Sequence, residues 1–197
     1  MKLRAIRILP DFFLCLSCLL LIIPVKWLLS WLIAAALHEL FHILALKVCG
    51  FQIRLICVGA FGAKIETDAE YGFRSMLCAL AGPLAGFLLL LFLRKIPMIA
   101  LCGLFQSIAN LLPIYPLDGG RAVRNLLLRF LPEDRVRRVL VPVERVIWIF
   151  LLGLSIYGFL KLHLGILPIL AALLLLLRKK YLAFKASCEY NSVIAYK

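Results

Sequence analysis

The sequence contains few polar residues. Of its 197 residues, 64% are apolar, compared with roughly 45–50% in an ordinary soluble domain. A soluble protein of this size could not bury so much apolar surface, because much of the surface of a small domain must face water. This composition excludes a soluble enzyme, a disordered protein and a secreted disulfide scaffold. It predicts an integral membrane protein in which residues 1–197 form a single polytopic domain.

Acidic residues are also scarce, with 10 Asp and Glu against 23 Lys and Arg, which gives a formal net charge of +13. In a soluble protein this balance would suggest a nucleic-acid partner. In a membrane protein, basic loops orient the chain and lie against anionic lipid headgroups, so we expect contacts with membrane lipid and no nucleic-acid partner. The seven cysteines lack zinc-ribbon spacing and lie mostly in apolar segments, so we interpret them as small apolar side chains.

The N-terminus lacks the cleavage site that follows a signal peptide, so we interpret residues 9–25 as a retained first membrane span. Further apolar segments predict five more spans, at about 27–48, 73–93, 97–117, 140–160 and 162–177. The predicted fold class is an α-helical integral membrane protein with about six transmembrane helices. This topology leaves few basic residues outside and predicts that both termini are cytoplasmic. The outside residues are Lys26, Arg94, Lys95 and Lys161.

Two segments between the spans have a different pattern. Residues 51–67 alternate apolar and polar side chains on both sides of Gly59-Ala60-Phe61-Gly62, which predicts a small β-hairpin at the membrane surface between the second and third spans. Residues 119–131 combine arginines with apolar residues and predict an amphipathic helix.

The second span contains the sequence His38-Glu39-Leu40-Phe41-His42. Histidines four residues apart lie on one side of a helix, so both can bind one zinc ion, with the intervening glutamate beside the water that zinc activates. The alternative is a pair of hydrogen-bonded histidines without a metal. A charge at the centre of a span costs about 2.5–3.5 kcal/mol on insertion scales, and a metal would offset such a cost. We therefore predict a metal site.

A catalytic zinc ion has three protein ligands and one open position. We predict Asp118 as the third ligand, because Pro113 and Pro116 break the fourth span just before it and the topology places it on the same side as the histidines. The alternative is that Asp118 caps the following helix. Asp11 lies on the correct side in a terminal segment, and His163 is expected on the opposite membrane face. Solvation or surface ion pairing accounts for the other acidic residues considered, which are Glu66, Asp68, Glu70, Glu133, Asp134 and Glu144.

These motifs resemble those of the site-2 protease (M50-type) family of intramembrane zinc metalloproteases. The matching residues lie within residues 38–121 and are His38-Glu39-Leu40-Phe41-His42, Asn110-x-x-Pro113-x-x-Pro116-Leu117-Asp118-Gly119 and Ala81-Gly82-Pro83-Leu84-Ala85. The chain is most similar to the six-span bacterial subgroup related to the sporulation protease that cleaves a pro-sigma factor. We expect it to lack the C-terminal nucleotide-sensing domain often found there. Where the family often has Asn, this chain has Gly86, which could instead allow close helix packing.

The resemblance implies that His38, His42 and Asp118 hold one Zn²⁺ per chain and that Glu39 is the general base. The implied activity is that of a zinc metalloendopeptidase. It would hydrolyse a peptide bond in or near the transmembrane segment of a membrane-anchored protein, close to the cytoplasmic leaflet of a bacterial cell membrane. A regulatory membrane protein is a further partner that this activity would accommodate.

Some roles stay open at the level of sequence. Asn110 could donate a hydrogen bond to the substrate or to a neighbouring helix, and residues 51–67 could pair with an extended substrate or form a simple surface loop. The competing function is a non-catalytic metal-binding or substrate-sequestering membrane protein, or a zinc transporter. The intact Glu39 argues against an inactive relative, and the lack of a repeat argues against a transporter.

Overall fold

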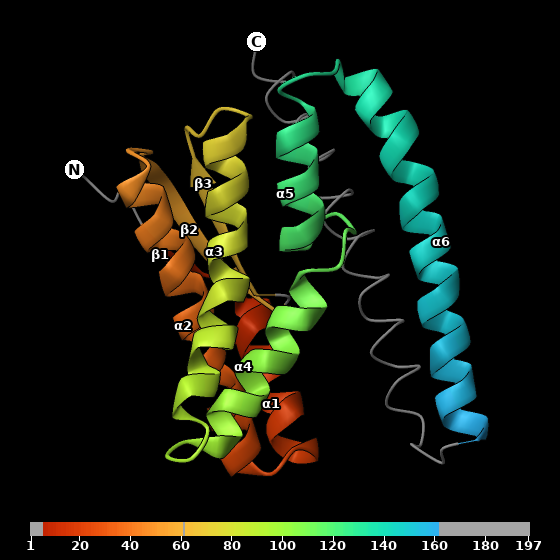
Figure 1. Cartoon of the computed structure of the whole chain (residues 1–197). Helices are drawn as coiled ribbons and strands as arrows, with labels where there is room; N and C mark the ends of the chain where they lie inside the picture. Colours follow the sequence, from red (N-terminus) through yellow and green to blue (C-terminus); the bar gives the residue numbers. More distant parts are fainter. Residues whose placement is uncertain (1–5, 61, 162–197) are drawn as a thin grey trace. The chain divides into compact units, whose positions relative to one another are not determined.

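Figure 1 shows the computed structural model of the chain, which describes residues 6–60 and 62–161. The elements in chain order are β1 (Ile6–Ile8), α1 (Pro10–Ile22), α2 (Val25–Val48), β2 (Ile53–Gly59), β3 (Gly62–Thr67), α3 (Phe73–Leu89), the 3₁₀ turn η1 (Leu90–Phe92), α4 (Pro97–Asn110), α5 (Asp118–Leu127) and α6 (Glu133–Leu160). The chain divides into two compact units, residues 1–138 and 139–197. The first unit holds every element through α5 and the start of α6, and the rest of α6 belongs to the second unit.

Helix α3 is central to the first unit. It contacts α2, α4 and α5, and α2 also contacts α4, so that α2, α3 and α4 lie side by side (Figure 1). The backbones of α3 and α4 approach closely at Gly86, where a side chain would collide with the Gly103 carbonyl and the Ser107 hydroxyl. Small residues permit such close approach between membrane helices. Gly86 therefore has the packing role that its sequence predicts.

A small sheet with the strand order β1-β2-β3 combines the strand before α1 with the two strands that follow α2. Strands β2 and β3 are antiparallel, with Ile56 opposite Ile65 and Gly59 opposite Gly62, which confirms the predicted hairpin. Strand β1 pairs in parallel with β2 and is missing from the sequence prediction. Its three residues are too few to show alternation, and its partner lies about fifty residues away in the chain.

Several helix boundaries differ from the predicted spans. Helix α4 ends at Asn110, because the residue before Pro113 is disfavoured in helical conformation. Helix α6 begins at Glu133 rather than near residue 140, since Glu133 and Asp134 suit the positive N-terminus of a helix. Helix α5 spans 118–127 rather than 119–131.

Three of the described helices are long and apolar enough to cross a membrane, namely Val25–Val48, Phe73–Phe92 (α3 with η1) and Glu133–Leu160. Helices α1 and α4 are apolar but shorter, with 13 and 14 residues. A helix of that length is about 20 Å long, against about 30 Å of bilayer hydrocarbon. The first and fourth predicted spans are therefore shorter than expected, and the sixth lies outside the described residues.

Candidate metal centre

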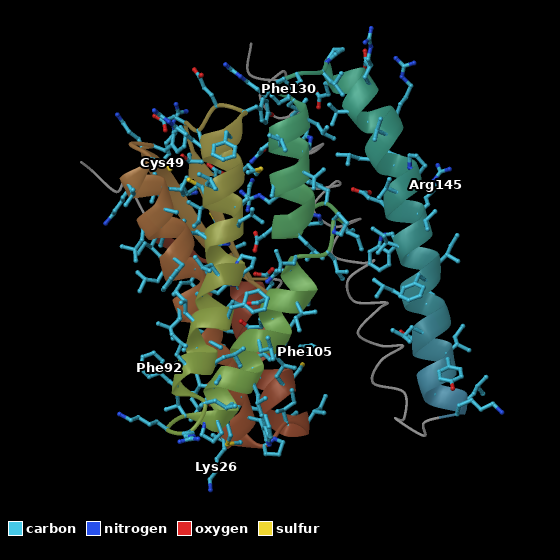
Figure 2. The ribbon with its side chains drawn as sticks, in the orientation of Figure 1. Lys26, Cys49, Phe92, Phe105, Phe130 and Arg145 are labelled. Atoms are coloured by element: carbon cyan, nitrogen blue, oxygen red, sulfur yellow. The ribbon has the colours of Figure 1, made fainter. Side chains whose placement is uncertain are left out.

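The two histidines lie on the face of α2 that packs against α3. Both side chains are buried, with 6% of each residue exposed, and Glu39 between them is half-buried. His42 lies seven residues before Cys49, which corresponds to about 10 Å along the helix. Figure 2 shows Lys26 and Phe92 at one end of the α2–α3 pair and Cys49 at the other. The histidines are therefore closer to the Cys49 end, within the hydrophobic length of α2.

Asp118 is the first residue of α5, and 7% of it is exposed. The N-cap position is occupied by Leu117, and no side chain caps the helix. Asp118 directs its carboxylate toward α2, where Oδ2 lies 2.9 Å from His38 Nε2 and 3.2 Å from His42 Nε2. The described structure therefore favours the ligand interpretation of Asp118 over the capping alternative.

The three groups converge on one point. The two Nε2 atoms are 3.2 Å apart, so the ligand atoms of His38, His42 and Asp118 form a triangle with sides of 2.9–3.2 Å. Two ligands at zinc–ligand distances of 2.0–2.1 Å and a tetrahedral angle lie about 3.3 Å apart. Among the described residues this is the one set of three or more His, Cys, Asp and Glu side chains close enough to hold a metal ion.

The hydrogen bonding of His42 supports a cation at this point. Its Nδ1–H donates to the Cys78 carbonyl of α3 at 2.8 Å, so Nε2 of the neutral ring carries a lone pair. This lone pair faces the Asp118 carboxylate and the His38 ring. Such an arrangement is repulsive unless a proton or a metal ion lies between the acceptors. The donor set therefore fits zinc, for which imidazole and carboxylate are ordinary ligands.

The charge state of Asp118 suits the same role. Burial by itself would raise the pKa of the Asp118 carboxyl, but when a proton lies between these groups the hydrogen bonds that His38 and His42 donate outweigh burial and hold the pKa below its ordinary value. Arg121 Nη1 lies 3.9 Å from Asp118 Oδ1 and adds a positive charge on the outer side. The carboxylate is therefore anionic and available to a cation.

Glycines leave room for this centre. A side chain at Gly82 of α3 would collide with the Nε2 atoms of His38 and His42, so Gly82 forms one wall of the site. Side chains at Gly119 and Gly120 would collide with the carbonyls of Leu111 and Ile114 in the loop that precedes α5. The sequence analysis missed these three roles. The Gly-Gly pair after Asp118 was the available signal, because adjacent glycines often mark a close approach of two backbone segments.

The remaining candidates lie away from the centre. Asp11 lies beside Gly59 of β2, and Asp68 accepts a hydrogen bond from the backbone N–H of Gln52. Glu66 pairs with Lys64 at 3.2 Å. Glu133 pairs with Arg124 as predicted, and His163 is outside the described residues. Asn110 is half-buried at the C-terminal end of α4 and is not one of the three converging groups.

Comparison with known proteins places this geometry in context. Residues 92–151, which contain Asn110 and Asp118, match the model of peptidase family M50. The fold is similar to that of a solved structure, the site-2 protease from Methanocaldococcus jannaschii, with a TM-score of 0.63, 22% sequence identity and 85% of each chain covered. This chain resembles the site-2 proteases. The search among curated proteins found no match.

Both findings agree with the resemblance predicted from the motifs, and the bacterial sporulation subgroup stays a prediction. The two findings support an intramembrane metalloprotease, and they agree with the apolar helices of the chain. The matched segment 92–151 does not include the His38–His42 motif. Of the three side chains that could hold a metal, Asp118 therefore lies inside the matched segment, and His38 and His42 lie outside it.

Proposed function

We propose that the chain is an intramembrane zinc metalloprotease with one zinc ion per chain. The observation that carries this proposal is the convergence of His38, His42 and Asp118 on one buried point with Glu39 beside them. Glu39 supports a catalytic role because hydrolysis needs a general base beside the water that zinc activates.

His38, His42 and Asp118 would hold the zinc ion. When bound, zinc supplies Lewis acidity that activates water and polarises the carbonyl of the scissile peptide. Glu39 is half-buried on α2 between the two histidines, and its proposed role is to accept the proton of the attacking water and pass it to the leaving amine. Cys78 keeps the His42 ring oriented through its backbone carbonyl.

The substrate of this proposal is a membrane-anchored protein cleaved in or near its transmembrane segment. A helical peptide shields its own carbonyls, so the segment must be extended at the scissile bond. Strand β3 is a terminal strand of the described sheet, and its outer edge could pair with such a segment by strand addition. Asn110, at the end of the helix that leads to the Asp118 loop, is a candidate donor to the substrate.

The location that we propose is a bacterial cell membrane, with about six spans, both termini in the cytoplasm and the metal centre toward the cytoplasmic leaflet. The uneven distribution of Lys and Arg supports this orientation. The position of the histidines nearer the Cys49 end of α2 is consistent with it.

The substitution Glu39→Gln tests the proposal against the non-catalytic alternative. It keeps the shape of the side chain and leaves all three metal ligands in place, so zinc content should stay at about one equivalent. Cleavage of a single-span substrate in liposomes should fall by about 10²-fold or more. The variant Asp134→Asn, which removes an exposed acidic charge at the start of α6, is the matched control. Undiminished cleavage by Glu39→Gln would reject this function and favour a metal-binding or substrate-sequestering protein.

A further inference from the structure

The loop between α4 and α5 carries Asp118, so whatever fixes this loop also fixes the third ligand. Residues 111–117 contain two prolines and no helical hydrogen-bonding pattern of their own. Two short backbone bonds, Ile114 N–H to Leu112 O and Leu117 N–H to Ile114 O, give the loop its local turns. The buried side chains of Ile114 and Leu117 hold one side of the loop in the first unit. On its other side the loop carries Tyr115, which is also attached from α5.

One side chain of α5 makes that attachment. The Arg124 guanidinium lies 5.5 Å from the centre of the Tyr115 ring and 6.0 Å from the centre of the Tyr71 ring. Its Nη2 donates to Glu133 Oε1 at 2.6 Å. Arg124 thus contacts the Asp118 loop, the segment before α3 and the start of α6 at the same time. A planar guanidinium can stack on aromatic rings and donate in its plane, which an ammonium group cannot do equally well.

The contact between Arg124 and Tyr115 affects Asp118 because Tyr115 lies close to it in the chain. Tyr115 is three residues before Asp118, in the segment whose carbonyls pack against Gly119 and Gly120. A movement of Tyr115 therefore moves the start of α5 and, with it, the carboxylate of Asp118. Zinc tolerates only about 0.2 Å of change in its ligand distances, so a small loop displacement weakens the site.

We propose that Arg124, through its contacts with Tyr115, Tyr71 and Glu133, is a positioning residue that sets Asp118 at the distance required for zinc. This inference rests on the proposed zinc site. It adds a residue that touches neither metal nor substrate. Asn125 on the same helix donates to the Ser75 carbonyl of α3 at 3.4 Å and fixes the position of the helix itself. Arg124 therefore fixes the position of the loop rather than that of the helix.

The test compares four variants of the full-length chain in detergent. The zinc dissociation constant of Arg124→Ala should rise about tenfold, the lower end of the range for residues that orient metal ligands. Tyr115→Leu should have a similar effect, and Tyr115→Phe, which keeps the ring, should have a smaller one. Arg129→Ala removes an exposed arginine near the end of α5 and is the matched control.

The visible absorption of the Co²⁺-loaded protein separates positioning from a purely structural role. If Arg124 positions Asp118, the intensity and shape of the cobalt bands should change in Arg124→Ala and Tyr115→Leu, change less in Tyr115→Phe, and stay constant in Arg129→Ala. An unchanged spectrum with zinc affinity within twofold of the wild type in both Arg124→Ala and Tyr115→Leu would overturn the inference. An equal loss in Arg129→Ala would overturn it as well. Neither result depends on cleavage. Failure of the positioning proposal can therefore be distinguished from failure of the protease proposal, which the Glu39→Gln experiment tests.

Discussion

Gly82 offers the most direct test of the geometry of the metal centre. In Gly82→Ala the added Cβ would lie 2.6 Å from His38 Nε2, about 0.8 Å inside the 3.4 Å at which ordinary contact begins, and still closer to His42 Nε2. The required displacement is about four times the 0.2 Å that zinc–ligand distances tolerate. We therefore expect Gly82→Ala to lower zinc affinity by about 100-fold, at the upper end of the effects seen when ligand orientation is lost.

Two other glycines serve as controls for this experiment. Gly86→Ala should destabilise the fold by about 1–3 kcal/mol through overpacking of α3 against α4, because its Cβ would meet the Gly103 carbonyl rather than a ligand. It should retain zinc in the fraction that folds. Gly153→Ala adds a methyl group where no other described residue lies within 4 Å, and it should stabilise α6 by up to about 1 kcal/mol without affecting zinc.

The assay is zinc competition with a chromophoric chelator, combined with metal analysis of the purified protein and thermal unfolding of each variant. The informative result is a loss of zinc in Gly82→Ala together with its retention in Gly86→Ala. If Gly82→Ala binds one equivalent of zinc with wild-type affinity, the three ligand atoms do not lie against α3, and the geometry described here is wrong.

Three further predictions concern the ligands and the orientation of the chain. Metal analysis should find about one zinc in the wild type and none in the double variant His38→Ala, His42→Ala; retention in the variant would place the metal elsewhere. Asp118→Asn should reduce zinc affinity by about 100-fold and abolish most cleavage, since a neutral amide is a poorer ligand; near-normal values would return the search to other carboxylates. A membrane-impermeant thiol reagent should label Cys188, which lies outside the described residues, and any accessible Cys49 only from the cytoplasmic side; labelling of Cys188 in intact cells would reverse the proposed topology.

Local patterns were enough to predict two of the three groups that the structure brings together. His38 and His42 are four residues apart, and the period of a helix alone places them on one face. Asp118 required one more step, the side of the membrane on which a proline-broken span ends, and the structure brings it within 2.9 Å of His38 Nε2. The hairpin was predictable for the same reason, because alternation and a glycine-containing turn are local signals.

The features that the sequence analysis missed depend on contacts between distant segments. Strand β1 pairs Ile6 with Ile56, and three residues carry too little pattern to predict a partner so far along the chain. The interaction of Arg124 with Tyr71 and Tyr115 is of the same kind. The predicted spans failed at their ends because hydropathy measures contact with lipid, whereas helix ends follow prolines and charges. Helix α4 accordingly ends before Pro113, and α6 extends back to Glu133.

Gly82, Gly119 and Gly120 connect the local sequence patterns with the contacts between distant segments. Asp118-Gly119-Gly120 fits a helix cap as well as a ligand when it is considered alone. The two interpretations differ in what they require of the glycines: a cap needs only the aspartate, whereas the observed site also needs Gly119 and Gly120 so that the loop at Leu111 and Ile114 can lie directly on α5. Gly82 imposes the same requirement from α3.

A buried triangle of ligand atoms therefore depends on the absence of a side chain at three positions, on two helices that are separate in the sequence. Without a metal, alanine at Gly82 would cost packing energy alone, since the histidine nitrogens would not have to keep a fixed geometry relative to Asp118. Sensitivity of zinc binding to this methyl group is thus a stronger argument for the metal centre than the proximity of the three ligands alone.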